Sequence, residues 1–312
     1  MKVLITCPPM LRQIDLFRPI FEEKGIELVT PNVVQTLSEE ALMDLLPEMD
    51  GWIIGDDPAT ERVFAAGKKG RLKAAVKWGV GVDNVDFKAC KKLGIPVINT
   101  PNMFGAEVAG IAVNYVIGLA RQTFLIDRAV RRGEWPKPAG ISLAGRVVAL
   151  IGFGDIGKAT AQRLKAFDMH INVYDPFAPR SDEDLENYRF LNFPEGLETA
   201  DFVVSTCALT PQTRHMINAE TIAQMKDGVR IVNVSRGPVI DEEALIEGLK
   251  SGKVHSAGLD VFETEPLPAD SPLRDFEQCI FGTHNGSNTI DAVIRASHEA
   301  IRKLFEFLFD EK

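Results

Sequence analysis

The sequence predicts an α/β protein with two domains, each built on a parallel β-sheet. Short apolar runs alternate with amphipathic segments along the chain, which is typical of parallel strands covered by helices. The length of 312 residues indicates two domains, at about 150 residues per domain. With 45% hydrophobic and 25% charged residues, the composition argues against disordered, collagen-like and membrane classes.

The first third of the chain is predicted to form one five-stranded unit. Its apolar runs predict strands at 3–6, 27–29, 52–54, 75–78 and 96–99. Helices are predicted at 11–24 and 87–93, because Gly25 and Gly94 follow these amphipathic segments in the position of a C-cap.

Residues 105–132 have almost no polar face, since Val108, Ile111, Val116 and Leu119 lie on different sides of a helix. Such a helix must be buried on several sides. The pattern leaves open an interdomain helix, a dimer contact and a central core helix of a monomer.

A second series of strands follows a turn-rich linker. Its members are predicted at 147–151, 171–174, 202–205, 231–234, 256–260 and 279–282. The last helix, 289–309, comes after this series is complete. We therefore expect it to return to the first domain.

Charge and cysteine content limit the partners and the compartment. The net charge of -9 disfavours nucleic acid or an anionic membrane as a bulk partner. Four widely spaced cysteines without a CxxC pair suggest neither a metal site nor a disulfide framework. The N-terminus lacks the long apolar region of a signal peptide, and no apolar stretch approaches the roughly 20 residues of a membrane span. We expect a cytoplasmic protein.

The string GFGDIG at 152–157 follows an apolar strand and opens a helix. In this context Gly152, Gly154 and Gly157 suit a tight turn, close backbone approach to a pyrophosphate, and packing of the helix on the sheet. Asp155 and Ile156 then contribute free N–H groups at the helix N-terminus. A turn without a ligand is the structural alternative.

Asp175 follows the next predicted strand, 18 residues beyond Gly157. A carboxylate there accepts hydrogen bonds from both hydroxyls of an adenosine ribose and repels a 2'-phosphate. The position predicts NAD rather than NADP. The alternative is a capping or turn aspartate before Pro176.

Three polar residues follow late strands, where open parallel sheets place their ligands. They are Arg236 in VNVSRGPVID, Glu265 in GLDVFETEP and His284 in IFGTHNGS. Singly, each fits a surface arginine, a loop carboxylate or a turn histidine.

Together with the glycine turn, these residues resemble the D-isomer-specific 2-hydroxyacid dehydrogenases, most closely the phosphoglycerate dehydrogenase branch. The resemblance covers nearly the whole chain and rests on motifs in family order. These are KWGVGVDNVD at 77–86, GIPVINTP at 94–101, GFGDIG, TPQTRHMI at 210–217, NVSRGPVID at 233–241 and GLDVFETEP at 258–266.

The resemblance implies two Rossmann-like or flavodoxin-like domains with the active site in the interdomain cleft. Residues 1–98 plus 287–312 would form the substrate (catalytic) domain, and 99–286 the NAD-binding Rossmann domain. The family also implies a homodimer held mainly through the nucleotide domains.

By position in the family motifs, Arg236 would bind the substrate carboxylate and polarise the keto oxygen with its fixed fork of donors. His284 would be the acid/base, with Glu265 as its partner. The turn containing Val80 and Gly81 would hold the carboxylate through backbone N–H groups. Lys77 offers charge for a phosphate, or is a strand-end lysine. Further cofactor contacts are implied at Cys207, Thr213, Asp260 and Gly286, with Asp260 near the nicotinamide carboxamide.

The chemistry requires these residue types. Oxidising a 2-hydroxy acid removes a hydroxyl proton while a hydride leaves the same carbon, so a base that titrates near neutrality is needed. Histidine fits, at an unperturbed pKa of about 6.5. A neighbouring carboxylate fixes its tautomer and stabilises the imidazolium.

Some positions depart from the family pattern. Phe104 and Gly110 stand where many members have the residues of TPxxN and VAE, and Cys207 where a histidine is common. Thr283 replaces the usual proline before the histidine, and Asn285 follows it. The chain ends at Lys312, so the regulatory domain of longer phosphoglycerate dehydrogenases is expected to be absent.

The predicted function is an NAD-dependent D-2-hydroxyacid dehydrogenase that interconverts a small 2-hydroxy acid and its 2-keto acid. The leading substrate is 3-phosphoglycerate. The alternatives are a glyoxylate or hydroxypyruvate reductase, a less favoured formate dehydrogenase, and a non-catalytic NAD(H)-sensing protein, because the same fold also serves a corepressor.

Overall fold

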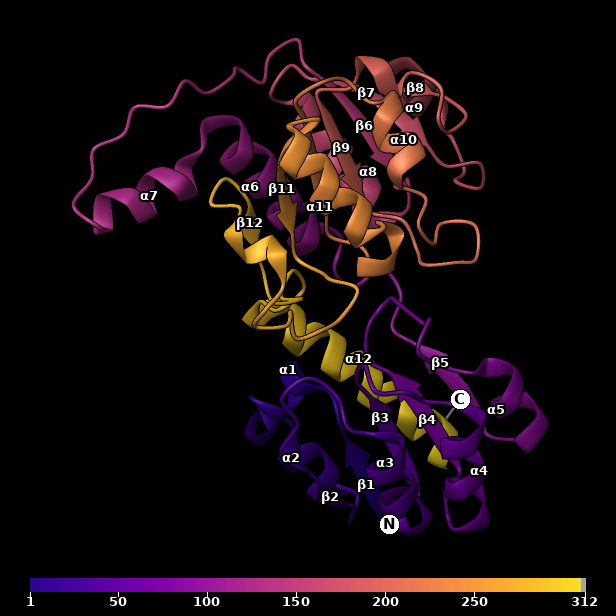
Figure 1. Cartoon of the computed structure of the whole chain (residues 1–312). Helices are drawn as coiled ribbons and strands as arrows, with labels where there is room; N and C mark the ends of the chain where they lie inside the picture. The colour runs from indigo at the N-terminus through magenta and orange to yellow at the C-terminus, as the bar shows by residue number, and fades with distance from the viewer. Residues whose placement is uncertain (310–312) are drawn as a thin grey trace. The chain divides into compact units, whose positions relative to one another are not determined.

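The computed structural model describes residues 1–309, and the chain divides into two compact units (Figure 1). One unit joins Met1–Met103 to the segment that begins at Asn288, and the other is Phe104–Ser287. Each contains one sheet whose paired strands are all parallel, so the predicted α/β class with two parallel sheets is confirmed.

The first unit has a five-stranded sheet in the order β2-β1-β3-β4-β5, the flavodoxin-like order. Its strands are β1 (Lys2–Ile5), β2 (Glu27–Val29), β3 (Gly51–Ile54), β4 (Ala74–Lys77) and β5 (Val97–Asn99). Its helices are α1 (Pro8–Leu11), α2 (Ile14–Glu23), α3 (Glu39–Leu45), α4 (Glu61–Lys69), α5 (Phe87–Leu93) and α12 (Ile290–Phe309). The strand order reverses between the neighbouring strands β1 and β3.

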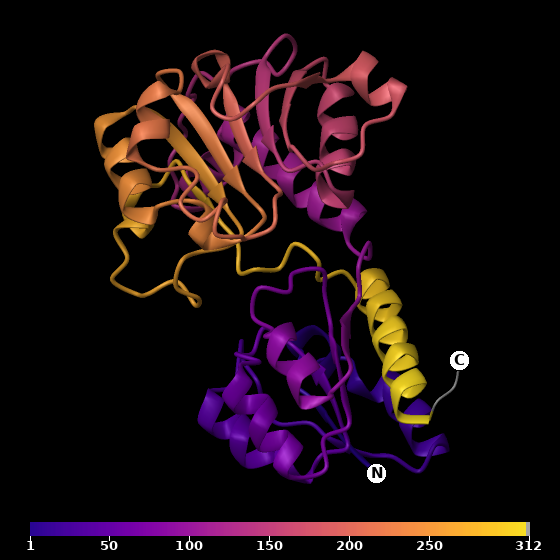
Figure 2. The ribbon, with the colours of Figure 1, turned by 90° about the vertical axis from the view of Figure 1, so that its right-hand side faces the viewer.

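The last helix, α12, packs on the first sheet although it follows the second unit in sequence (Figure 2). Gly51 lets it approach, because a Cβ there would lie 3.2 Å from side-chain carbons of Leu304 and Leu308. The Trp78 indole N–H also donates to the hydroxyl of Ser297 on α12 at 3.1 Å. The apolar face of α12 thus completes the core of the first unit.

The second unit has a seven-stranded sheet in the order β12-β11-β10-β9-β6-β7-β8. Its strands are β6 (Val147–Ile151), β7 (His170–Tyr174), β8 (Arg189–Phe190), β9 (Phe202–Ser205), β10 (Val229–Asn233), β11 (Val254–Leu259) and β12 (Ile280–Phe281). Its helices are α6 (Gly105–Arg121), α7 (Thr123–Arg131), α8 (Asp155–Lys165), α9 (Asp182–Asn187), α10 (Ala219–Gln224) and α11 (Glu242–Ser251). Counted from β6, this is the Rossmann order with a seventh strand added, and the order reverses between β6 and β9.

Two predicted helices differ from the structure. The helix predicted at 11–24 is two helices that begin at Pro8, because prolines are tolerated in a first turn where N–H groups have no intrahelical partner. The segment predicted at 105–132 breaks at Gln122, whose φ of 54° is left-handed. The two-residue strand β8 was not predicted from its sequence.

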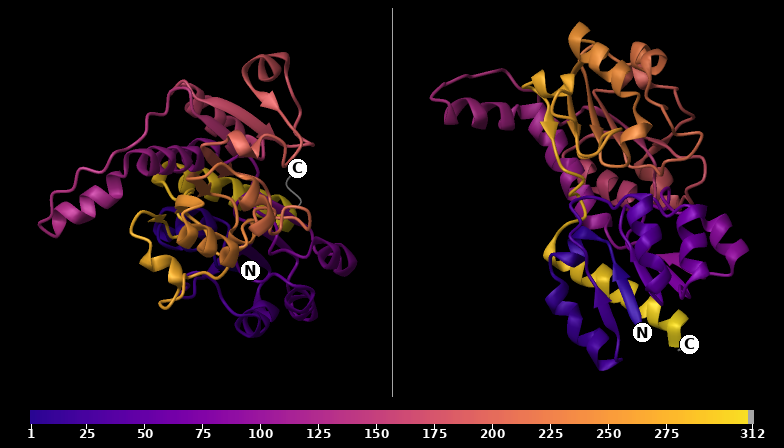
Figure 3. Two further views of the ribbon diagram at one scale, coloured as in Figure 1. Left: turned by 45° about the horizontal axis from the view of Figure 1, so that its top comes forward. Right: turned by 60° about the horizontal axis from the view of Figure 1, so that its bottom comes forward.

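Helix α6 buries most of its apolar side chains, as expected for a helix with almost no polar face, and it packs against α8 and the strands β10 and β11. Tyr115 contacts β11, where a Cβ on Gly258 would lie 2.8 Å from the Tyr115 Cβ. Beyond Gln122, α7 and the chain after it extend away from the sheet (Figure 3). Among residues 1–309, no single helix has the length and apolarity to cross a bilayer, although the bent pair α6 and α7 reaches these limits together.

Candidate active site

Arg236, Glu265 and His284 follow three neighbouring strands of the second unit. Arg236 comes after β10, Glu265 after β11 and His284 after β12, and these strands are adjacent in the sheet. Because parallel strands end at the same edge, all three residues lie along the carboxyl edge. The topology therefore collects residues that are up to 48 positions apart, from 236 to 284.

The structure pairs His284 directly with Glu265. Nδ1 of His284 lies 2.8 Å from Oε2 of Glu265, and the two side chains are 23% and 21% exposed. The other oxygen, Oε1, accepts the backbone N–H of Phe262 at 3.0 Å, which fixes the carboxylate. Since a carboxylate accepts, this network assigns the proton of the neutral imidazole to Nδ1.

His284 sits on a turn that is anchored to Asp260. Its backbone has a left-handed φ of 53°, and its N–H donates to the carbonyl of Asp260 at 2.6 Å. The Asp260 carboxylate accepts the N–H groups of Asn285 at 3.3 Å and Gly286 at 2.8 Å. The structure thus gives Asp260 and Gly286 a local task, which is to hold the turn that carries the histidine.

Tyr115 on α6 is a further member of this anchor. Its hydroxyl donates to Oδ1 of Asp260 at 3.4 Å, and burial together with the Asp260 charge raises the pKa of the tyrosine. Sequence reasoning missed this residue, because it stands inside an apolar helix 145 positions from its partner. Its one available signal was a hydroxyl on an otherwise apolar face.

Arg236 is presented by a buried polar network. The amide of Asn233 donates to the Arg236 carbonyl at 2.9 Å, while its oxygen accepts the N–H and hydroxyl of Ser235 at 3.0 and 2.7 Å. The Ser235 and Ser205 hydroxyls lie 2.8 Å apart. This network fixes the backbone from which the guanidinium extends. Sequence reasoning missed these three residues as supports of the arginine.

Gly237 allows the arginine loop to touch the loop that carries Glu265. A Cβ on Gly237 would lie 1.9 Å from the backbone carbonyl of Phe262, so another residue type would separate the two loops. The Arg236 guanidinium also donates to the carbonyl of Ser235 at 3.0 Å. The loops after β10 and β11 are therefore in direct backbone contact.

The predicted glycine turn lies where the strand order reverses, between β6 and β9. Gly152 has a φ of 92°, and a Cβ on it would lie 2.7 Å from the backbone of Cys207 after β9. A Cβ on Gly157 would lie 2.2 Å from the Gly152 carbonyl oxygen. A Cβ on Gly154, in contrast, meets nothing within 4 Å. Two glycines serve packing, and the third leaves open space in which a phosphate group fits close to the backbone.

Helix α8 begins directly after this turn, with Gly154 as its N-cap and Asp155 and Ile156 in its first turn. First-turn N–H groups have no intrahelical partner, and the helix dipole places partial positive charge there. The residues present therefore fit the pyrophosphate of a dinucleotide.

Asp175 lies at the end of β7, beside the glycine turn. One carboxylate oxygen accepts the N–H of Phe153 at 2.8 Å, and the other accepts those of Phe177 and Ala178 at 2.9 and 3.0 Å. The structure thus shows the turn role of Asp175, and these bonds to backbone N–H groups hold its carboxylate beside the glycine turn.

Cys207 and Thr213 lie in the loop after β9. The Thr213 hydroxyl accepts the N–H of Thr210 at 2.8 Å and donates to the Ala208 carbonyl at 2.7 Å, so it closes the loop. The Cys207 thiol lies 3.6 Å from the Ser205 hydroxyl, and burial raises its pKa. Both side chains have structural contacts, and the backbone of Cys207 packs against the glycine turn.

The predicted substrate residues Lys77, Val80 and Gly81 belong to the first unit. Lys77 is 2% exposed, and its Nζ donates to the carbonyl of Gly55 at 2.6 Å and to Asp56 at 2.8 Å. It therefore joins the end of β4 to the loop after β3. Val80 and Gly81 lie in the accessible part of the turn after β4.

Two positions that depart from the family pattern lie at the start of α6. Phe104 is buried as the N-cap residue. After it, a Cβ on Gly105 would lie 2.5 Å from the Asp155 carboxylate, which brings α6 against the start of α8. Gly110 is exposed, and a Cβ on it would meet nothing within 4 Å.

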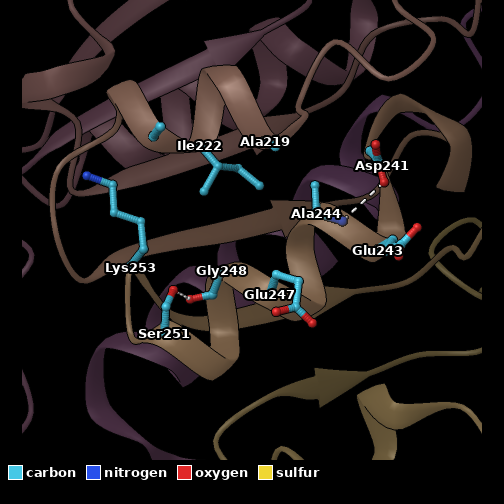
Figure 4. Close-up of a pocket in the computed structure, with 10 residues that line it drawn as sticks. Ala219, Ile222, Asp241, Glu243, Ala244, Glu247, Gly248, Ser251 and Lys253 are labelled. Carbon is cyan, nitrogen blue, oxygen red and sulfur yellow. Dashed lines mark hydrogen bonds between the residues drawn. The ribbon is translucent and has the colours of Figure 1, made fainter.

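A separate pocket lies between α10 and α11 (Figure 4). Apolar residues such as Ile222 and Ala244 line it, and its polar groups have local tasks: Asp241 caps α11 through the N–H of Ala244, and Ser251 donates to the Gly248 carbonyl. Within residues 1–309, no cluster of three or more His, Cys, Asp or Glu side chains has a metal-binding arrangement.

Comparison with known proteins decides the family. Residues 113–286 match the model of the "D-isomer specific 2-hydroxyacid dehydrogenase, NAD binding domain". The chain belongs to this family. It is 39% identical over 278 residues to hydroxypyruvate reductase of Thermotoga maritima, a match that covers 87% of this chain and 89% of the relative.

Two further comparisons agree with this result. D-3-phosphoglycerate dehydrogenase of Methanocaldococcus jannaschii is 36% identical over 93% of this chain, which spans only 54% of that relative. The crystal structure of the TT0316 protein of Thermus thermophilus superposes with a TM-score of 0.88 at 29% identity, covering 100% of this chain and 98% of that one. The protein is an NAD-dependent 2-hydroxyacid dehydrogenase, and its cofactor is NAD.

The position of Asp175 in this dehydrogenase predicts a strong preference for NAD over NADP, because its carboxylate would repel a 2'-phosphate. Replacing Asp175 by Ser and Pro176 by Arg is expected to narrow the preference by on the order of tenfold or more, with each tenfold corresponding to about 1.4 kcal/mol. The measurement is kcat/KM for both reduced cofactors. Asp182→Ser removes an exposed carboxylate of the same unit as control. Equal efficiency of the unmodified enzyme with both cofactors would contradict the assignment.

Proposed function

We propose that the enzyme transfers hydride between NAD(H) and a small D-2-hydroxy or 2-keto acid, with Arg236, Glu265 and His284 as its catalytic residues. The observation that carries this proposal is the 2.8 Å pair of His284 and Glu265, held at the same sheet edge as Arg236. Two polar networks hold the backbone of these residues. One, through Asp260, holds the turn that carries His284, and the other, through Asn233, holds Arg236.

In the reductive direction, the bound reduced nicotinamide supplies the hydride for the keto carbon. Nε2 of His284 donates a proton to the keto oxygen, which becomes the hydroxyl of the product. Arg236 binds the carboxylate and stabilises the charge that develops on that oxygen. In the oxidative direction His284 removes the hydroxyl proton as a base.

Glu265 accepts from Nδ1 and thereby keeps Nε2 directed to the substrate. Its negative charge also stabilises the imidazolium, which is the form that starts the reduction. The backbone N–H of Phe262 holds Glu265, and the backbone carbonyl of Asp260 holds His284. The pair therefore functions as one acid/base unit.

We assign residues 1–98 and 287–312 to substrate binding and 99–286 to the cofactor. The turn that contains Val80 and Gly81 follows β4 and offers backbone N–H groups for a carboxylate. We also assign four residues to the cofactor site, because each helps to shape a loop of the second unit. They are Cys207, Thr213, Asp260 and Gly286.

The side chain of the substrate separates the candidates. Sequence resemblance favours 3-phosphoglycerate, and phosphoglycerate dehydrogenases are among the relatives. Hydroxypyruvate and glyoxylate reductases are relatives of similar identity, so both are candidate activities. The deciding experiment is turnover of NADH with glyoxylate, hydroxypyruvate and 3-phosphohydroxypyruvate. If NADH binds but none is reduced at any pH tested, the catalytic proposal fails and a non-catalytic NAD(H) sensor is favoured.

We also infer that the enzyme acts in the cytoplasm as a homodimer. All four cysteines are free thiols, which supports a reducing compartment. Near the bend at Gln122, Val130 on α7 and Trp135 beyond it are 44% and 78% exposed, and exposed apolar side chains of this kind are suited to a partner chain. We expect Trp135→Ser with Val130→Ser to weaken the dimer, as measured by sedimentation. A monomeric unmodified protein would contradict the inference.

A further inference from the structure

The loop Gly55–Asp57 lies at the switch point of the first unit. In a sheet of this order the strand order reverses between β1 and β3, and ligands of such sheets bind beyond the carboxyl ends of the strands at that point. The loop after β3 touches the end of β1, since a Cβ on Gly55 would lie 2.7 Å from the carbonyl oxygen of Thr6. Gly55, Asp56 and Asp57 thus occupy the ligand position that the topology defines.

This loop is joined to the turn that we assign to the substrate carboxylate. The Lys77 ammonium bonds to the Gly55 carbonyl and to Asp56, and a Cβ on Gly79 would lie 3.8 Å from that ammonium. On the other side, the Asn84 amide donates to the carbonyls of Gly55 at 3.1 Å and Asp57 at 2.7 Å. The loops after β3 and β4 therefore form one surface.

The charge of this surface is acidic. The Lys77 side chain is 3% exposed, and its ammonium pairs with Asp56, whose own side chain is 38% exposed. Asp57 is buried and accepts the N–H groups of Leu37 and Gly55 at 2.8 and 3.1 Å, and its burial raises its pKa. The buried lysine thus presents no exposed positive charge next to the glycine turn, whereas the Asp56 carboxylate is exposed there.

We infer that Asp56 selects against phosphorylated substrates and favours a small 2-keto acid whose side chain is uncharged and carries a hydroxyl. This inference rests on the proposed function. A phosphate brings roughly -1.5 to -2 charges and would meet a carboxylate where a cation is needed. A substrate hydroxyl can instead donate to Asp56, and the substrate carboxylate remains on the backbone N–H groups after β4.

The test compares three keto acids that differ only at this end: 3-phosphohydroxypyruvate, hydroxypyruvate and glyoxylate, which has no side chain. For the unmodified enzyme with NADH, we expect kcat/KM for the phosphorylated compound to lie at least about 10²-fold below that for hydroxypyruvate. The reason is that the phosphate and the Asp56 carboxylate repel each other. Asp56→Asn should raise the phosphorylated rate and lower the hydroxypyruvate rate, each by roughly five- to tenfold. Glyoxylate should be nearly unaffected, and it reports that the variant is folded.

Glu27→Gln is the matched control, because it removes one negative charge from β2 at the amino edge of the same sheet, where Glu27 lies 3.9 Å from Lys2. It should leave all three values unchanged. Equal or better turnover of the phosphorylated compound by the unmodified enzyme would overturn the inference and leave the proposed function intact. An Asp56→Asn enzyme with unchanged ratios would also overturn it. Failure of all three substrates would overturn the proposed function, and the inference with it.

Discussion

The His284→Ala enzyme is expected to lose between about 10² and 10⁴ of its turnover at every pH, because it lacks the group that exchanges the substrate proton. NADH binding should be unchanged, since the glycine turn and Asp175 lie at β6 and β7 rather than at β12. The measurements are single-substrate kinetics and NADH titration by fluorescence. Near-normal turnover would reject the acid/base assignment.

His215→Ala provides a matched control for this loss. Nε2 of His215 lies 2.7 Å from Oε1 of Glu263, and the histidine also has a left-handed φ, of 50°. The pair of His215 and Glu263 is therefore the same kind of histidine–carboxylate pair as that of His284 and Glu265. His215 is more exposed, at 43%. Because His215 lies in the loop after β9 and pairs with Glu263 rather than Glu265, His215→Ala is expected to retain most of its turnover.

Glu265→Gln distinguishes the charge of the partner from its shape. Reduction starts from protonated His284, so the rate falls as pH rises through the titration of that histidine in the cofactor complex. The carboxylate favours the charged imidazole, and its removal makes the proton leave more easily. The falling limb of the rate profile should therefore move to lower pH, with each unit equal to about 1.4 kcal/mol. An unshifted limb would reject the electrostatic role of Glu265.

The positions of these residues along the sheet could be predicted from sequence, because strand ends are local features. Apolar runs before Arg236, Glu265 and His284 identify β10, β11 and β12, and parallel strands bring their carboxyl ends to one edge. The glycine turn was predictable for the same reason. Its spacing encodes a local strand–turn–helix conformation.

The residues that hold the catalytic side chains in place could not be predicted, because their contacts join distant segments of the chain. Tyr115 meets Asp260 only after α6 has packed on β11, and nothing near Tyr115 in the sequence marks that contact. Lys77 shows the opposite case. Its sequence position suggested a free charge at a strand end, and the neighbouring loop supplies a carbonyl and a carboxylate that bind it.

Helix boundaries show which local signals conflict with tertiary packing. Pro8 and Pro9 look like helix breakers, yet a first turn accepts them because their missing N–H groups would have no intrahelical partner. The apolar run through α6 and α7 continues across Gln122, whose left-handed backbone nevertheless ends the first helix. Hydrophobic periodicity identifies a helix better than it locates its end.

Arg236→Ala is expected to lower turnover and weaken substrate binding together, because the guanidinium acts on both the carboxylate and the developing alkoxide. Loss of one preorganised donor to such a charge costs about 10²- to 10³-fold in turnover, and loss of the carboxylate contact should raise KM in addition. NADH affinity should barely change. Arg163→Ala, in the last turn of α8 and away from the carboxyl edge, is the control for removal of a guanidinium from the same unit.

Arg236→Lys tests the geometry of the contact rather than its charge. Lysine keeps the positive charge but loses the planar fork of donors, so it should restore only part of the turnover. Ser235→Ala, which removes a hydroxyl from the network under the arginine, should give a smaller loss in turnover with little change in KM. The arginine would be structural if Arg236→Ala bound and reduced a 2-keto acid normally. Full activity of Arg236→Lys would show instead that a point charge suffices at this edge.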